Sequence, residues 1–481
     1  MKTTNDLTQG SIVKALLKLA TPIIGMSFLQ MAYNMIDMMW LGHVGSEAVA
    51  AVGTATFFTW LGVSVMLIVK VATEVGVSQR LGAKKNEDAS LFAGNAITWM
   101  LILSVAYGIF TYFAAPWLIS FFKLDSAEVI KMSIGYLQII ALGAPFYYMN
   151  QPLTGIFTGA GNSSLPFMAT TIGLVVNLVI DPIFIFGYGP IPGMGAEGAA
   201  WATILSKFIV TYILILTLKK NIINLPIALE HFKMKWEMTK EIFRVGTPVG
   251  LHSGLFACFA MILARIISQW GDLPIAVQSV GAQIESISWM TVEGLATALA
   301  SFTGQNFGAK KWERIYKGFL VAVGLSVALG IVVGTMFIFF GGEIFGLFIN
   351  EPEAIRLGGI YFFILGLSQL FMCLEIATSG AFYGLGKTNA PSIVGITFTG
   401  LRIPLALWLT SIPALGMTGV WWSISISSFV KGIILFVWFL IFILLHPEKD
   451  KSKLIGKRWV RFLPMRVRQQ IMESSINHNE K

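Results

Sequence analysis

Three polar side chains stand inside apolar stretches, where a carboxylate is costly and is usually functional. Asp37 ends a long apolar run near the N-terminus, and Asn177 and Asp181 are four residues apart within another run. That spacing places Asn177 and Asp181 on one face of a helix. Two carboxylates and an amide carbonyl supply the oxygen atoms that hold a proton or a sodium ion. We therefore predict an ion site, with sodium as one candidate, at Asp37, Asn177 and Asp181.

A second pair of acidic residues, Glu285 and Glu293, is eight residues apart in a later apolar run. Eight residues bring both side chains to nearly the same helix face. We predict that they line a cavity, where they would bind a cationic compound or a second proton. The alternative is that they pair with basic residues of neighbouring helices, with Arg402 and Lys431 as the candidates.

Other reactive residues in the apolar runs predict packing or pairing. Lys70 and Glu74 are at positions i and i+4 and are expected to pair with each other. Lys207 receives no role. Cys258 and Cys373 belong to no paired cysteine or histidine motif, so they are interpreted as packing residues.

Enzymatic motifs do not emerge from the sequence. Gly386-Lys387-Thr388 resembles the end of a phosphate-binding loop, but the first glycine of that motif is replaced by Ala381 and no strand precedes it. Metal-protease and nucleophilic-serine motifs are absent as well. The sequence predicts that the protein is not an enzyme and that it needs no cofactor beyond the coupling ion.

The composition requires a membrane around these side chains. Of 481 residues, 55% are hydrophobic and 12% are charged, whereas soluble domains carry roughly 25% charged residues. Uncharged runs such as 48–69 and 319–342 reach the roughly 20 residues that cross a bilayer. We predict an all-α integral membrane protein with twelve transmembrane helices at 16–40, 48–80, 89–114, 129–152, 165–187, 196–218, 242–270, 274–306, 315–341, 355–378, 391–413 and 417–446.

The net charge of +9 is read as membrane topology and not as an affinity for nucleic acid, because the basic residues lie between the apolar runs. One set of alternate loops is basic and includes Arg80, Lys84, Lys85, Lys219, Lys220, Lys310, Lys311 and Lys387. The other set carries Lys123, Lys131 and Arg356. The positive-inside rule then predicts both termini in the cytoplasm of a multi-pass protein of the plasma membrane.

The two halves of the sequence repeat each other. Thr21-Pro22 recurs as Thr247-Pro248, and Gln79 and Gly82 recur as Gln305 and Gly308, in each case 226 residues later. Six spans per repeat make the two copies parallel, so two six-helix lobes should enclose a central cavity. We predict an N-terminal lobe at 1–218, a cytoplasmic linker at 219–241, a C-terminal lobe at 242–446 and a basic cytoplasmic tail at 447–481.

Several of these segments resemble the multidrug and toxic compound extrusion (MATE) family. The similar segments are Asp37 to Ala51, Gly159 to Asn162, Asn177 to Gly187 and Gly304 to Ala309. The resemblance covers residues 10 to 446. It implies proton- or sodium-driven export of amphiphilic, often cationic drugs, and it implies that Asp37, Asn177 and Asp181 form the ion site, lined by Tyr33, Tyr136 and Thr203.

The sequence departs from symmetry and from the family pattern in two places. The second-half counterparts of Asp37, Asn177 and Asp181 are Leu263, Arg402 and Ala406, so the ion site is confined to the first lobe. Phe256 stands where some MATE proteins carry a carboxylate on the seventh helix. A cation site of that type is therefore not expected in the second lobe.

Taken together, these features predict a cation-coupled antiporter that exports amphiphilic, mainly cationic compounds. Glu285, Glu293, Met26, Met31, Trp289 and Met290 are the candidates for lining its cavity. The alternative is a flippase for a lipid-linked saccharide, which would need a basic cavity for pyrophosphate. The partners of this protein are expected to be small organic cations and the lipid bilayer, with no nucleic acid. We expect the protein to be a monomer.

Overall fold

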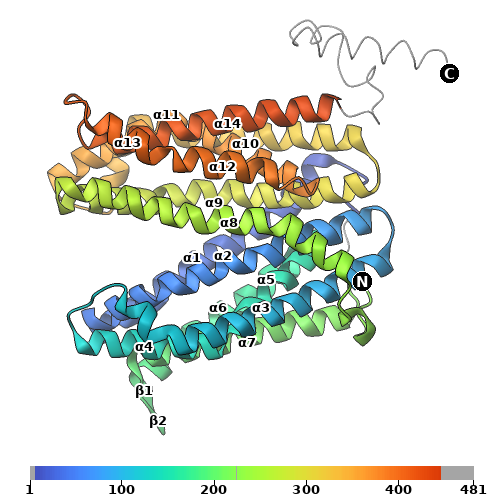
Figure 1. Ribbon diagram of the computed structural model, residues 1–481, viewed down its shortest axis with the longest axis horizontal. Helices are drawn as coiled ribbons and strands as arrows, with labels where there is room; N and C mark the ends of the chain where they lie inside the picture. Colours follow the sequence, from blue (N-terminus) through green and yellow to red (C-terminus); the bar gives the residue numbers. More distant parts are fainter. Residues whose placement is uncertain (1–5, 224, 446–481) are drawn as a thin grey trace, which may run out of the picture.

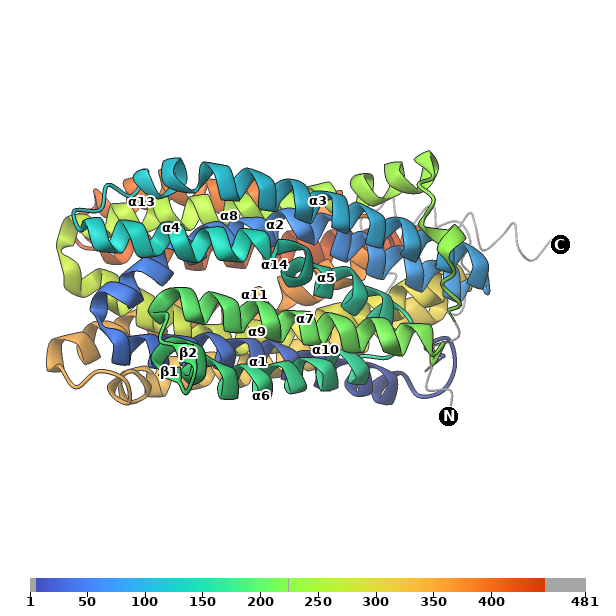
Figure 2. The same cartoon turned by 90° about the horizontal axis from the view of Figure 1, so that it is seen from below.

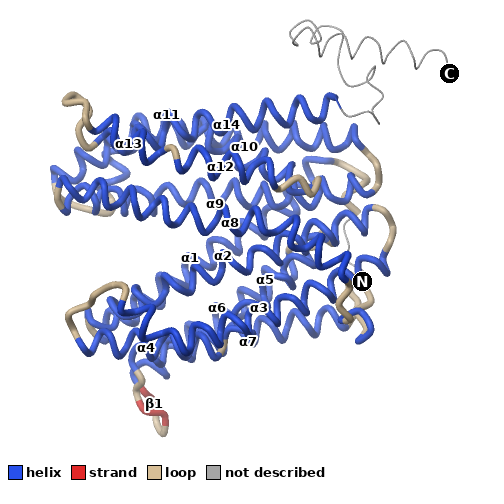
Figure 3. The backbone as a smooth tube through the Cα atoms, in the orientation of Figure 1, coloured by secondary structure: helices blue, strands red, loops and turns tan. Residues whose placement is uncertain are grey.

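The computed structural model describes residues 6–223 and 225–445, and the predicted basic tail at 447–481 lies outside them. The described chain is almost entirely helical, with loops gathered at the two ends of a long bundle (Figure 3). The first half contains α1 (Ile12–Val44), α2 (Ser46–Gly82), α3 (Asn86–Ser120), α4 (Ala127–Leu142), α5 (Ala144–Gly159), α6 (Ser164–Phe186), a two-residue antiparallel pair β1 (Gly187–Tyr188) and β2 (Ile191–Pro192), and α7 (Gly195–Lys219).

The second half follows the same order. After a short 3-10 turn, η1 (Leu229–Phe232), it contains α8 (Trp236–Ile267), η2 (Ser268–Trp270), α9 (Asp272–Gly308), α10 (Trp312–Gly346), α11 (Pro352–Gly384), α12 (Asn389–Gly400), α13 (Arg402–Thr410) and α14 (Thr418–Leu445).

Ten helices of the described chain are long and apolar enough to cross a membrane, and the bent pair α4–α5 makes an eleventh. The twelfth predicted span is α9. It is as long as α2, at 37 residues, but it carries Glu285 and Glu293. The predicted all-α membrane fold is therefore confirmed, and the spans agree in order with those expected from the apolar runs.

Two predicted spans are broken helices. The span expected at 129–152 bends by 53° between α4 and α5, at Gly143 and just before Pro145. The span expected at 391–413 is interrupted at Leu401, between α12 and α13. Pro404 explains the second break, because a proline lacks the N–H that would bond to the carbonyl of Gly400 and its ring crowds that carbonyl. Figure 2 shows α4 and α5 following one another along the first half.

The helices form two lobes that meet at the end carrying the N-terminus and diverge toward the other end (Figure 1). We call these the joined end and the open end. The lobes exchange the first parts of two helices. Leu16 and Leu19 of α1 belong to a core cluster with Phe302 and Phe319 of the second lobe. In the same way, Ile242 and Val245 of α8 pack into a core cluster of the first lobe, with Phe92, Phe157 and Leu214.

The later parts of α1 and α8 return to their own lobes. Leu41 of α1 packs with Ile185 and Ala199 of the first lobe, and Leu263 of α8 packs with Phe362 of the second lobe. Pro22 and Pro248 lie inside these two helices, next to the residues where each helix passes between the lobes. Helices α1 and α8 thus belong to both lobes and can transmit movement between them.

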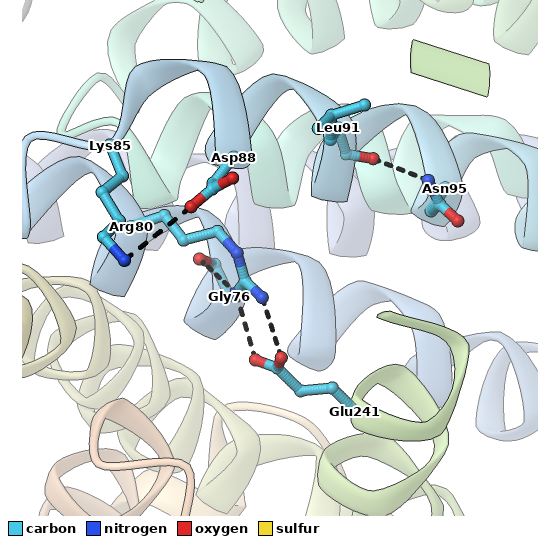
Figure 4. Close-up of polar contacts among 7 residues, drawn as sticks. All are labelled: Gly76, Arg80, Lys85, Asp88, Leu91, Asn95 and Glu241. Atoms are coloured by element: carbon cyan, nitrogen blue, oxygen red, sulfur yellow. Dashed lines mark hydrogen bonds and ion pairs between the residues drawn. The ribbon is translucent and has the colours of Figure 1, made fainter. Parts of the chain in front are cut away.

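The segment predicted as a linker is folded against α3. Asn95 of α3 donates hydrogen bonds to the carbonyls of His231 and Lys233 and accepts one from the Lys235 N–H. Helix α8 begins at Trp236, earlier than the residue 242 expected from hydropathy. Arg80 of α2 then forms a two-pronged ion pair with Glu241 of α8, at 2.8 and 3.1 Å (Figure 4).

Candidate ion and cargo site

The buried centre of the first lobe brings together the residues predicted for ion binding. Asn177 Nδ2 donates a 2.8 Å hydrogen bond to Asp181 Oδ1, and both side chains have no exposed surface. Asp37 of α1 lies beside Asp181, Asn177 and Thr203. The site is thus assembled from α1, α6 and α7. The four-residue spacing of Asn177 and Asp181 creates the one hydrogen bond that the sequence could predict.

Five buried oxygen atoms at this centre have no hydrogen-bond partner among the described residues. They are Tyr33 Oη, Asp37 Oδ1, Asn177 Oδ1, Asp181 Oδ2 and Thr203 Oγ1. Buried polar atoms in folded proteins are ordinarily paired, so this cluster of unpaired oxygen atoms indicates a place where a ligand can bind. Because Asn177 uses its amide nitrogen on Asp181, its carbonyl oxygen is left for that ligand. Carboxylate, carbonyl and hydroxyl oxygens are suited to a small hard cation, and the carboxylates are equally suited to a proton.

Tyrosines surround the carboxylates. Tyr33 is 5% exposed and Tyr136 of α4 is 7% exposed, and Tyr136 lies close to both Asp37 and Asp181. All six residues predicted for the ion site therefore meet in one place. Tyr147 of α5 also lies near Asp37, and sequence reasoning did not single it out, because one tyrosine in an apolar run carries no periodic or motif signal.

Lys207 is the main residue at this centre that the sequence analysis left without a role. Its Nζ donates a 3.0 Å hydrogen bond to Gln30 Oε1 and lies 4.7 Å from the centre of the Tyr33 ring. It also lies near Asp37. A lysine on α7 and an aspartate on α1 are far apart in the chain, so only the tertiary structure places them together.

The second lobe contains a different arrangement of buried charges. Lys431 of α14 forms a 2.9 Å ion pair with Glu375 of α11, and both residues are buried. Arg402 donates hydrogen bonds to Ser427 and Ser428 at 3.0 and 3.2 Å. The alternative of pairing Lys431 with Glu285 or Glu293 is therefore wrong, because Lys431 is paired with Glu375. Glu375 stands five residues before the repeated glycine Gly380, a position that the repeat could have drawn attention to.

Glu285 and Glu293 both belong to α9, but they have different neighbours. Glu285 lies near Arg402 and within reach of the Tyr361 hydroxyl. Glu293 is exposed and lies near Lys70 of the opposite lobe, so it faces between the lobes. Lys70 lies near its predicted partner Glu74, and it also lies near Glu293. Glu74 in turn accepts a 2.8 Å hydrogen bond from Ser301 of the other lobe.

The four apolar candidates for the cavity are partly accessible. Met26, Met31 and Met290 are half-buried, and Trp289 is exposed. Met26 also packs against the core cluster that joins α1 to the second lobe. Their contact with cargo stays a prediction.

Comparison with known proteins identifies transporters of the same shape. The family model described as MatE matches residues 22–183 and 248–408, one segment in each repeat. A protein named probable multidrug resistance protein NorM from Thermotoga maritima is 28% identical over 420 residues, covering 85% of this chain and 88% of its own.

Solved structures superpose over nearly the whole chain. One is described as the outward-facing conformation of a multidrug resistance MATE family transporter, with a TM-score of 0.82, 26% identity, and coverage of 92% of this chain and 98% of its own. Another, from Pyrococcus furiosus, has a TM-score of 0.84, 26% identity and the same coverage. It is described as a transporter of the MOP superfamily whose binding pocket has reversed polarity, suggesting a different function.

Proposed function

This chain belongs to the MatE family of multidrug-efflux transporters, and we propose that it exports small organic compounds in exchange for a proton or a sodium ion. The observation that carries the proposal is the cluster of five buried, unpaired oxygen atoms around Asp37 and Asp181. A transporter that uses an ion gradient needs a site that can load and release a cation, and these oxygens form one inside the first lobe.

The position of Asp37 supports a coupling role. Asp37 stands in the later part of α1, within the first lobe, whereas Leu16 and Leu19 of the same helix pack into the second lobe. Binding of a cation changes the charge at Asp37 and therefore the preferred position of α1. Pro22 supplies the point at which the helix can bend. Coupling then follows from ordinary linkage, because the ion binds the two arrangements of the lobes with different affinity.

The proposed orientation places the joined end in the cytoplasm of a plasma-membrane protein. Arg80 in the last turn of α2 and Lys84, Lys310 and Lys311 in the loops make this end basic, and the positive-inside rule assigns such segments to the cytoplasm. The divergent lobes of Figure 1 would then open outward. We expect the transporter to act as a monomer, because each chain carries both lobes.

The proposed cargo is an amphiphilic cation. Glu293 faces between the lobes and Glu285 stands on the same helix, which supports attraction of positive charge. The flippase alternative would require a basic cavity, yet Lys431 is neutralised by Glu375. The names of the curated relatives also favour drug export over lipid flipping.

The test uses purified protein in proteoliposomes loaded with an ethidium-type dye, driven in turn by a pH gradient and by a sodium gradient. One of the two gradients should drive dye movement, and Asp37→Asn or Asp181→Asn should abolish it. Asp125→Asn, which alters an exposed carboxyl between α3 and α4, is the matched control and should transport normally. Transport by both Asp37→Asn and Asp181→Asn at wild-type rates would refute the ion site.

A further inference from the structure

The ammonium group of Lys207 is held by neutral groups. Its Nζ lies 4.7 Å from the centre of the Tyr33 ring and 5.8 Å from that of Tyr147. Among the described residues, the only hydrogen-bond acceptor for its protons is Gln30 Oε1, at 3.0 Å. In the described parts of the chain, Lys207 takes part in none of the ion pairs. Two aromatic faces and an amide oxygen are the groups with which proteins recognise cations.

The same ammonium stands beside the ion site. Lys207 lies near Asp37, and Tyr33, which covers the ammonium, is one helical turn before Asp37 on α1. The charged or titratable groups at this centre are Tyr33 and Asp37 from α1, Tyr136 from α4, Tyr147 from α5, Asp181 from α6 and Lys207 from α7. Lys207 is thus the positive side chain of a group that contains two carboxyls.

From this geometry we propose that Lys207 is a built-in counter-cation, which leaves the Asp37–Asp181 site with room for one coupling ion per transport cycle instead of two. The inference rests on the proposed function, since it concerns the same ion site. Two ionised carboxylates carry two negative charges, and Lys207 balances one of them. One proton or one sodium ion then completes the neutralisation. The ammonium also fills the space between the Tyr33 and Tyr147 rings, so that a cationic head group of the cargo is kept out of it.

The second lobe has a buried lysine in a similar place, but that lysine is held in an ion pair. With the offset of 221 residues between Gly198 and Gly419, Lys431 corresponds to Val210, which is three residues from Lys207 on the last helix of its lobe. Both lobes therefore carry a lysine on nearly the same face of the last helix. Lys431 is locked to Glu375 by a 2.9 Å ion pair. Among the described residues, Lys207 has no such ion pair. It lies near Asp37, where its charge affects the loading of the ion.

The experiment measures the number of coupling ions moved with each cargo molecule. Wild-type protein is reconstituted in proteoliposomes, and ethidium flux is measured under a series of ion gradients and membrane potentials. The gradient at which the net ethidium flux is zero gives the number of ions moved per ethidium molecule. Wild-type protein and Lys207→Arg, which keeps the charge, should move one ion per cycle. Lys207→Gln and Lys207→Met should move two, with the Hill coefficient for the ion rising accordingly. A ratio of two in the wild-type protein, or of one in both neutral variants, would overturn the proposal.

A second measurement tests the occupied space between the rings. Tetramethylammonium is the probe, and Lys207→Met should bind it about tenfold more tightly than the wild-type protein does, because both ring faces become free for a cation. Unchanged binding would contradict this part of the inference. Asp37→Asn and Asp181→Asn are run in the same vesicles, and the proposed function fails if both variants still couple ion to dye at wild-type rates. If both lose coupling and Lys207→Gln moves one ion, the result refutes the role of Lys207 alone.

Discussion

Gln79 of the first lobe and Gln305 of the second lobe make equivalent hydrogen bonds, each to a backbone carbonyl of the opposite lobe. Gln79 Nε2 donates to the carbonyl of Gly384, and Gln305 Nε2 donates to the carbonyl of Gly159, both at 2.8 Å. The four residues are repeat counterparts of one another. The joined end is therefore closed by a reciprocal pair of bonds, and Gln305 adds a third, since its Oε1 accepts from the Leu7 N–H at 3.1 Å.

We expect Gln79→Leu and Gln305→Leu to loosen the joined end to different extents. Each removes a hydrogen bond worth about 1 kcal/mol, but Gln305→Leu also removes the acceptor of the Leu7 N–H. Hydrogen exchange of the Leu7 amide should therefore accelerate in Gln305→Leu and stay near wild type in Gln79→Leu. Gln138→Leu is the control, because Gln138 donates to the Tyr112 carbonyl within one lobe. Equal exchange in all three variants would contradict the asymmetry.

Gly82→Ala and Gly308→Ala should hinder closure of the joined end. An added Cβ at Gly82 would lie 1.9 Å from the Gln305 carbonyl oxygen, and one at Gly308 would lie 1.9 Å from that of Gln79. Backbone atoms cannot move aside as side chains do, so helices α2 and α9 would have to separate. We expect slower dye export and a lower melting temperature. Gly324→Ala, on α10 with no atom within 4 Å of the added Cβ, should behave like the wild-type protein.

Breaking the ion pair in the second lobe should destabilise the protein. Lys431→Met leaves the buried Glu375 carboxylate without its partner, which costs about 3–5 kcal/mol for a buried pair. The melting temperature in detergent should fall sharply. The double variant Glu375→Met with Lys431→Met should recover most of the loss, because neither charge of the pair remains. A double variant as unstable as Lys431→Met would show that the pair contributes through packing and not through charge.

Cysteine labelling tests the proposed orientation. Cys258 and Cys373 are first replaced by serine, and single cysteines are then introduced at residues 43, 125, 351, 84 and 310. An impermeant maleimide should label 43, 125 and 351 in intact cells, and 84 and 310 only after permeabilisation. The reverse pattern would place the joined end outside the cell, and the lobes in Figure 1 would then open inward.

Local patterns in the sequence determined much of this protein. Apolar runs reveal the spans because a bilayer requires about 20 such residues for each helix, and the 226-residue repeat reveals the two lobes. The four-residue spacing of Asn177 and Asp181 predicts their shared face. The cost of a charge in lipid singles out Asp37 and Asp181 as functional candidates, and the structure places them side by side.

Tertiary structure decided what depends on distant parts of the chain. The passage of α1 and α8 between the lobes is invisible to hydropathy, because a helix is equally apolar whichever lobe it packs against. The partners of the buried charges could not be predicted from the sequence either, because Glu375 and Lys431 are on different helices, as are Lys207 and Asp37. Periodicity reports which face of one helix is apolar, whereas charge pairing depends on how several helices are rotated against each other.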